Sequence, residues 1–452
     1  MLTRMENKRT AIMNKIAKSH ADNMAYSRFF NNESVTVPAI LQVLQNRVVQ
    51  ASEGKHVLCI QDTTEINYQK HQKFFRTDDE ELGPVGNNRD IGFFMHPTMV
   101  VDTGGYFPTG ISYIHIWNRK ADKKDKYERG YKYQPTEEKE SYRWISSGQK
   151  SIELLAGTAA HITFVGDRES DMYEEFTNLK GPHTDVLVRC KENRLLYGEE
   201  KKLYDYLSSQ PIAGTYKISV RTDKRKNRES REALIEVRFC KVKVCRPKNH
   251  IDKTLPEYIE LTAIEAKESE FTVPSNEKPI NWRLLTTHNV SDIASAITIV
   301  TWYKTRWLIE ELFRLLKQKG IDIESSQLES GKGLKKLAVM ALEVALRILQ
   351  LKQDRDGLCS MEASIAFTPE EIAFAEKIYN RRLKGKTRKQ QNLYKKGSLA
   401  RMSWIIARLG GWKGYRSTTL PGPITFIRGL EEFDMMFTGH ILSGLDRDMY
   451  IE

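Results

Sequence analysis

The stretch HITFVGDRESDMYEEF (residues 161–176) decides the fold of this chain. It opens with a short apolar run that is typical of a buried strand, and the run ends at an acidic residue, Asp167. We expect a helix to begin near Ser170, soon after the strand. A strand that leads into a helix predicts a crossover unit of a parallel sheet, with Asp167 at the carboxyl end of its strand.

The segments around this stretch predict a mixed sheet. Residues 55–68, KHVLCIQDTTEINY, contain an apolar run that ends just before Asp62, and residues 94–117 predict two strands joined at a Gly-Gly break. The remaining elements are a helix over 139–157 and a strand over 184–191. This order, an antiparallel meander followed by crossovers, predicts an α/β fold of the ribonuclease H-like type.

We divide the chain into three regions. Residues 1–50 predict short helices with a basic start, residues 51–355 the ribonuclease H-like domain, and residues 356–452 a helical C-terminal region. Within the central domain, about 90 residues at about 195–285 alternate apolar and polar side chains between strongly basic turns. This alternation predicts an all-β insertion.

Two later helices have recognisable start signals. Before the segment that opens at residue 293, Ser291 is the expected N-cap, with Asp292 in the first turn. Farther on, Thr368 is the expected cap, Pro369 the first helical residue and Glu371 the third, which together predict a capping box.

The composition indicates a globular protein with a polyanionic partner. Hydrophobic residues make up 40% of the 452 residues, which excludes a disordered chain. The net charge of +12 favours nucleic acid ahead of a membrane as partner, although many proteins are basic for no specific purpose. The five cysteines form no C-x-x-C pair, which fits a reducing compartment. No apolar run reaches about 18 residues, and segment 334–352 is interrupted, as in an amphipathic helix, by Lys335, Lys336, Glu343 and Arg347.

The stretch TWYKTRWLIEELFRLLKQKG (301–320) predicts one long helix with a distinctive polar side. At about 100° per residue, a strip about 60° wide, opposite the apolar arc, carries Tyr303, Arg306, Glu310 and Lys317. The alternative is an ordinary solvated face with an Arg306–Glu310 pair, worth only about 0.3–0.5 kcal/mol.

Three carboxylates form a candidate catalytic group. Asp62 and Asp167 each follow a predicted strand, and ligand chemistry in crossover sheets gathers at the carboxyl ends of strands. Glu310 would come from the later helix packed beside that sheet. Hard divalent cations take oxygen ligands, and two such ions about 3.5–4 Å apart can promote an in-line phosphoryl displacement.

These residues carry a resemblance to a known family. IQDTTEINY, VGDRESDMYEEF and the Y-x₂-R-x₃-E-x₆-K run that begins at Tyr303 resemble the three acidic motifs of cut-and-paste DDE transposases from bacterial insertion sequences. The specific branch is the insertion-sequence-four type, which has a Y-R-E-K signature and a β-insertion before the last motif. The resemblance covers nearly everything from about residue 25 to the end.

The resemblance implies a mechanism. Asp62, Asp167 and Glu310 would hold two Mg²⁺ ions, for which Mn²⁺ could substitute. Water would nick one strand at each element end, and the freed 3′-OH would attack the opposite strand to form a hairpin. After the hairpin is reopened, the 3′-OH would attack target DNA. The implied partners are double-stranded DNA, both element ends and target, and a second copy of the chain in a synaptic complex, in the bacterial cytoplasm at the nucleoid and without a membrane.

The resemblance also implies DNA contacts. Tyr303, Arg306 and Lys317 would hold phosphates near the cut. Trp282 would stack on a base flipped from the duplex, although a half-buried core tryptophan is the alternative. Arg189 matches a DNA-contacting arginine, although a strand-end arginine could equally pair with a carboxylate. The basic turn at 221–233 could contact the DNA backbone, although such turns are usually only solvated.

The front of the chain departs from the family pattern. Members of this branch carry a longer N-terminal helical domain that reads the element ends, whereas about 60 residues precede Asp62 here. We therefore expect salt-sensitive DNA binding with poor discrimination between element ends and random sequence. Two other functions stay open at this point: a nuclease without strand transfer, and a DNA-binding regulator derived from a truncated transposase.

Overall fold

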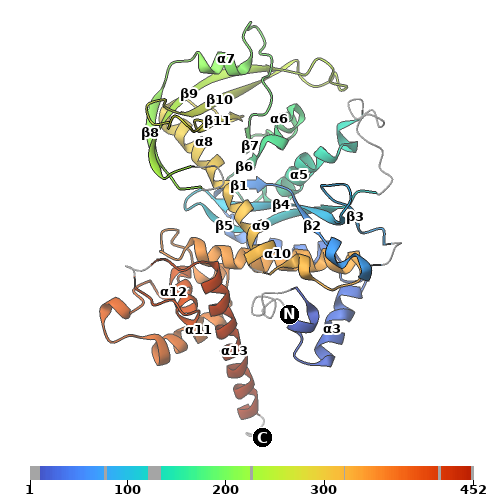
Figure 1. The fold of residues 1–452 in the computed structure, drawn as a ribbon, viewed down its shortest axis with the longest axis vertical. Coiled ribbons are helices and arrows are strands. Elements are labelled where there is room, and N and C mark those ends of the chain that lie inside the picture. The colour runs from blue at the N-terminus through green and yellow to red at the C-terminus, as the bar shows by residue number, and fades with distance from the viewer. Residues whose placement is uncertain are drawn as a thin grey trace. The chain divides into compact units, whose positions relative to one another are not determined.

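The computed structural model describes residues 11–75, 79–120, 134–223, 228–319, 321–415 and 419–448 (Figure 1). The chain forms two compact units. The first unit, here the helical unit, comprises residues 1–55, 63–123 and 308–452, and the second, the sheet unit, comprises residues 56–62 and 124–307. The mixed α/β fold predicted from the sequence is confirmed. The domain boundaries predicted at residues 50 and 355 stay predictions.

In the part of the sheet unit that the structure describes, seven strands form the sheet. Three parallel strands form one side of its sheet: β1 (His56–Gln61), β6 (His161–Gly166) and β7 (Thr184–Arg189). The sheet continues from β7 through antiparallel strands in the order β11 (Asn281–Thr286), β10 (Tyr258–Glu268), β9 (Arg231–Cys245) and β8 (Gly214–Val220). The strands predicted within 161–167 and 184–191 are thus present. The insertion predicted at about 195–285 contains antiparallel strands, but it is not all-β, because residues Leu203–Ser208 form a helix.

Helices cover both faces of this sheet (Figure 1). The unit's helices are α5 (Arg143–Leu155), α6 (Tyr173–Leu179), α7 (Leu203–Ser208) and α8 (Ile293–Thr305), with short 3₁₀ turns at Thr136–Glu138, Glu140–Tyr142 and Arg168–Ser170. Helices α5 and α6 pack closely, because a Cβ on Gly148 would lie 2.6 Å from Cδ1 of Leu179. On the other face, Trp302 of α8 packs against His56 of β1, with ring centroids 4.7 Å apart.

Two predicted helix starts in this unit are wrong. The helix after β6 does not begin near Ser170: Asp167 caps a single 3₁₀ turn, Asp171 leaves the helical region with ψ 69°, and α6 begins at Tyr173. Helix α8 is capped by Asp292 and not by Ser291. The Asp292 carboxylate accepts from the Ser295 backbone N–H at 2.7 Å, and the Ser295 hydroxyl accepts from Asp292 N–H, which closes a capping box.

The helical unit combines an antiparallel sheet with helices. Its strands are β2 (Thr64–Asn67), β3 (Gly83–Pro84), β4 (Ile91–Asp102) and β5 (Phe107–Trp117), and β4 and β5 form the predicted hairpin. Its helices are α2 (Met13–Ile16), α3 (His20–Asn31), α4 (Val37–Ala51), most of α9 (Trp307–Arg314), α10 (Gly331–Gln353), α11 (Pro369–Ile378), α12 (Leu399–Leu409) and α13 (Pro423–Asp448). Short 3₁₀ turns lie at Gln69–Phe74, Ile323–Ser325, Ala363–Ile365 and Arg388–Gln390, and π-helical turns at Leu315–Lys319 and Tyr379–Leu383. The capping box predicted at Thr368 is confirmed.

Helix α10 is not the amphipathic helix that its charges predicted. It is buried on nearly all sides, Lys335 and Lys336 included. The Lys336 ammonium donates to the carbonyls of Phe30 and Asn32, both at 2.8 Å. Lys335 pairs with the Glu81 carboxylate at 2.7 Å. Buried cations are tolerated where hydrogen-bond acceptors replace water, and sequence periodicity does not reveal such partners. Among the described residues, no helix is long and apolar enough to cross a membrane.

The stretch 301–320 is not one continuous helix. Helix α8 ends at Thr305, α9 begins at Trp307, and residues 315–319 are π-helical. The hydroxyls of Thr301 and Thr305 donate to carbonyls four residues back, at 2.8 and 2.9 Å, and such bonds bend helices. Tyr303 is buried at 5% exposure. The predicted exposed strip is therefore wrong where it includes Tyr303.

Candidate active site

Asp62 and Asp167 lie at the same edge of the sheet unit. Strands β1 and β6 are parallel neighbours, and Ile60 pairs with Val165 in their register. Each aspartate follows its paired residue by two positions, so both side chains belong to the same face of the sheet. Neighbouring strands are about 4.8 Å apart, so the fold brings together two carboxylates that are far apart in sequence.

A cation is bonded to one of these carboxylates. Nη1 of Arg306, the residue between α8 and α9, lies 2.8 Å from Oδ2 of Asp62. Both side chains are largely buried, at 13% and 19% exposure, so water screens this pair less than a surface pair. The Asp167 carboxylate accepts the backbone N–H of Glu169 at 2.8 Å, which fixes its orientation. The edge therefore carries two oriented carboxylates and one guanidinium.

The surroundings of Tyr303 include several of the predicted site residues. Burial raises the pKa of its hydroxyl; the charges of Arg306 and Arg189 oppose the rise, and that of Asp167 adds to it. Tyr303 therefore lies within electrostatic reach of all three charges. The Trp282 ring, half-buried on β11, meets the Tyr303 ring edge-on with centroids 5.9 Å apart.

Arg189 ends β7 and is partly exposed. Its Nη2 donates to the backbone carbonyl of Asn281 at 3.4 Å. This bond is to a carbonyl and not to the carboxylate that the alternative interpretation supposed. With Arg306, Arg189 is a second guanidinium whose charge acts on Tyr303. Such surroundings suit an anionic ligand.

Glu310 and Lys317 belong to the helical unit. Glu310 is half-buried in the first turn of α9, and Lys317 lies in the π-helical turn that follows. The Lys317 ammonium is 3.5 Å from the Glu324 carboxylate, which also accepts the Asn67 backbone N–H. The neighbouring Glu311 pairs instead with Arg314 and with Lys352 of α10. Glu311 is thus engaged in ion pairs within its own unit.

The basic turn predicted as a DNA contact is partly neutralised. Residues 224–227 of the turn lie outside the described residues. Of the remainder, Arg231 pairs with the buried Glu268 at 3.0 Å and with Glu277 at 2.8 Å, and Arg228 pairs with Glu277 at 3.2 Å. These two arginines bind carboxylates of the insertion itself.

The sequence analysis missed Trp307. This tryptophan directly follows Arg306 and is 65% exposed, which is unusual for so large an apolar side chain. Periodicity could not identify it, because an aromatic residue in a helical pattern usually faces a core. Its position next to an arginine was the available signal. An exposed indole beside a guanidinium is a combination that suits nucleic-acid bases.

A buried acid lies behind Asp167. Glu175 of α6 is 1% exposed, and its Oε1 accepts the Ser170 hydroxyl at 3.0 Å. Burial raises the pKa of Glu175 well above its usual range, and the charges of Asp171 and Asp167 raise it further, against the Ser170 hydrogen bond. The folded protein therefore holds Glu175 in its neutral form at a pH where the unfolded chain has lost the proton.

We predict that Glu175→Gln stabilises the protein at neutral pH. Because the folded-state pKa is raised, folding binds a proton above about pH 4.5, and stability falls as pH rises, by at most about 1.4 kcal/mol per pH unit. Glutamine is neutral and similar in size, so it removes this dependence. Thermal unfolding of wild type and variant at pH 5 and pH 7.5 measures this pH dependence. If the stability advantage of Glu175→Gln over wild type does not increase from pH 5 to pH 7.5, Glu175 is not held in its neutral form.

One comparison with known proteins bears on this site. Residues 147–346 match the model of a family described as the transposase DDE domain. The matched residues include Asp167, Tyr303, Arg306, Glu310 and Lys317, whereas Asp62 precedes them. Proteins with this domain act on DNA and generally use divalent metal ions, which clustered carboxylates suit. Together with the two aspartates at one sheet edge, this match supports a DDE transposase.

Proposed function

We propose that this chain is a cut-and-paste DNA transposase of the Y-R-E-K branch, with a ribonuclease H-like catalytic domain. The observation that carries the proposal is the register of β1 and β6, which puts Asp62 and Asp167 at one edge. Arg306, bonded to Asp62, supplies a cation at the same place. A carboxylate pair beside a guanidinium suits phosphoryl transfer from a DNA backbone.

The donor set fits hard divalent cations. The carboxylate oxygens of Asp62, Asp167 and Glu310 are of the kind that Mg²⁺ and Mn²⁺ prefer, and these residues would hold the ions. When bound, two such ions activate the attacking oxygen and stabilise the leaving one. Arg306 neutralises Asp62 at 2.8 Å, which offsets the repulsion between the neighbouring carboxylates.

The cations and aromatic rings would position DNA. Arg306, Arg189 and Lys317 would bind phosphates, and Tyr303 would orient the Arg306 guanidinium, which lies 5.9 Å from its ring centroid. Trp282 would stack on a base flipped out of the duplex when the hairpin forms. Trp307, exposed beside Arg306, offers a second stacking surface. Two copies of the chain would join the two element ends.

The reaction is best tested on a duplex that ends in the element's own terminal repeat. With Mg²⁺, the expected products are first a nick and then a hairpin, which a denaturing gel separates from plain double-strand breaks. Plain breaks without hairpins would indicate a nuclease without strand transfer. If the chain binds this DNA but does not cleave it in either Mg²⁺ or Mn²⁺, the proposal is wrong. The alternative that remains is a DNA-binding regulator derived from a truncated transposase.

We predict that Trp282→Ala slows hairpin formation more than nicking. Hairpin closure needs a base outside the stack, whereas nicking does not, and one lost base stack is worth about 1–3 kcal/mol. The two rates come from one time course on the same gel. The matched variant, Trp282→Phe, keeps an aromatic face and should recover part of the hairpin rate. Equal slowing of both steps would assign Trp282 to packing against Tyr303.

A further inference from the structure

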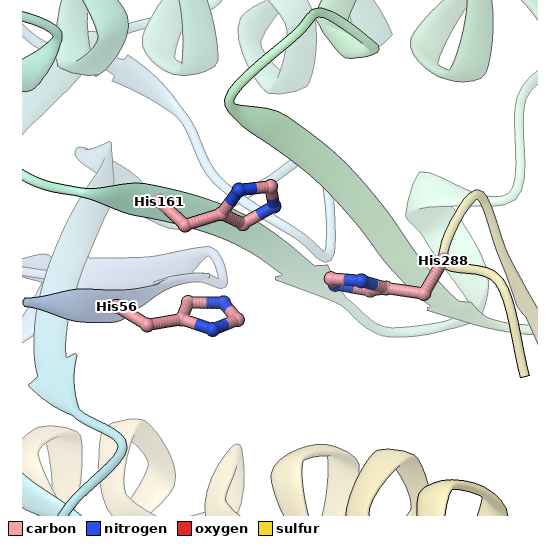
Figure 2. Close-up of side chains that lie close together, drawn as sticks. All are labelled: His56, His161 and His288. Carbon is pink, nitrogen blue, oxygen red and sulfur yellow. The ribbon is translucent and has the colours of Figure 1, made fainter.

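Three histidines of the sheet unit turn their rings toward one another (Figure 2). His56 begins β1, His161 begins β6, and His288 follows the end of β11. One nitrogen of each ring lies within 4.8 Å of a nitrogen of the other two. Among the described residues, this is the group whose side chains are arranged to hold a metal ion.

We propose that His56, His161 and His288 bind a divalent transition-metal ion, with Zn²⁺ as the natural occupant. Neutral imidazole suits zinc and its neighbours in the first transition row, whereas Mg²⁺ and Mn²⁺ prefer oxygen. Nitrogens bound to one tetrahedral zinc are about 3.3 Å apart, so the rings need to approach by at most about 1.5 Å. Three histidines leave the fourth position for water.

The surroundings orient the rings as a metal site requires. The Thr163 hydroxyl lies 2.8 Å from Nε2 of both His56 and His288, so both nitrogens face this hydroxyl, and an ion bound to them would replace these two hydrogen bonds. Oδ2 of Asp185 lies 3.3 Å from Nδ1 of His288 and 2.8 Å from Nε2 of His161. A carboxylate on the second nitrogen of a ligating histidine fixes its tautomer and raises its basicity.

The histidine rings are packed in place and remain accessible to solvent. Trp302 packs against His56 and His288 with centroid distances of 4.7 and 5.2 Å. The side chains of His161 and His288 remain 26% and 15% exposed, which leaves an entry path from solvent.

This site is separate from the carboxylate edge. His56 precedes Asp62 by six residues, and His161 precedes Asp167 by six residues, on the same two parallel strands. At about 3.3 Å per residue, the two sites lie about 20 Å apart, at opposite ends of β1 and β6. The ion would cross-link β1 and β6 to the segment between β11 and α8, and would hold the strands that end in the two aspartates.

The test uses Co²⁺, a spectroscopic substitute for Zn²⁺, on chelator-treated full-length protein with excess Mg²⁺ to occupy the carboxylates. We expect one Co²⁺ per chain, with the intense visible bands of four-coordinate cobalt, and stoichiometric displacement by Zn²⁺. His161→Asn and His288→Asn should each lose the bands or weaken binding at least tenfold. Asp185→Asn should weaken binding by about 10–100-fold.

Two matched variants separate this site from other binding. Asp167→Asn alters the proposed catalytic carboxylates and should leave the bands unchanged, so the result does not depend on transposase activity. His183→Asn removes an exposed histidine of the same unit and should also leave them unchanged. Circular dichroism establishes that each variant is folded. Weak, six-coordinate spectra in wild type, or unchanged affinity in folded His288→Asn, would show that the histidines form a hydrogen-bond network only.

Discussion

Alanine at Asp62, Asp167 or Glu310 is expected to abolish Mg²⁺-dependent cleavage while DNA binding is largely retained. Each change removes carboxylate oxygens that the proposed ions need, and we expect a loss of at least about a thousandfold, or ~4 kcal/mol of transition-state stabilisation. Phosphate contacts come from other side chains, so affinity should change little. A gel for products and a filter assay for binding, on the same preparations, measure both.

Three further variants sharpen this experiment. Glu153→Ala removes an exposed α5 carboxylate that pairs with Lys150 and should cleave at the wild-type rate. Glu311→Ala should reduce cleavage far less than Glu310→Ala, because Glu311 binds Arg314 and Lys352. Asp62→Asn accompanies Asp62→Ala, because it keeps a hydrogen-bond acceptor for Arg306. If Glu310→Ala cleaves as well as wild type, the three-carboxylate assignment is wrong.

The second large effect concerns stability. Asp171 lies between Asp167 and α6, and its side chain is fully buried. Its carboxylate accepts from Arg194 Nη2 at 2.6 Å and from the backbone N–H groups of Lys191 and Glu192 at 2.7 and 3.1 Å. We predict that Asp171→Ala lowers the free energy of unfolding by about 3–5 kcal/mol, because it leaves a largely buried guanidinium and two backbone donors without this acceptor.

Urea unfolding monitored by fluorescence measures this loss. Asp205→Ala, an exposed change on α7, should stay within about 0.5 kcal/mol of wild type. The double variant Asp171→Ala/Arg194→Met no longer contains an unpaired charge. Its free energy of unfolding should therefore fall by less than the sum of the decreases in the two single variants. Additive losses would show that Asp171 and Arg194 are not energetically coupled.

The sequence predicted the two strands and the positions of Asp62 and Asp167 at their ends, because both signals are local. An apolar run that ends at Asp62 or Asp167 is visible within ten residues. The same local reasoning failed where a long-range partner decides the outcome. The buried position of Lys336 depends on carbonyls about 300 residues away, at Phe30 and Asn32.

The polar side of residues 301–320 shows the limit of periodicity. A helical wheel assumes one straight helix, whereas here α8 ends at Thr305 and a new helix begins at Trp307. The wheel also treats Tyr303 as polar, although its ring is buried against Trp282. The histidine group escaped notice because its members come from two strands and the segment after a third, and none stands in a spaced metal-binding motif.

The equal spacing of histidine and aspartate on β1 and β6 limits how this gene can change in length. Side chains alternate between the faces of a strand, so loss or gain of one codon within β1 would turn either His56 or Asp62 to the opposite face. The same holds for His161 and Asp167 on β6. Substitutions at the apolar positions between them can be absorbed by repacking, whereas single-codon insertions and deletions cannot. Among natural variants, we therefore expect changes of length to fall in the loops and not in these two strands.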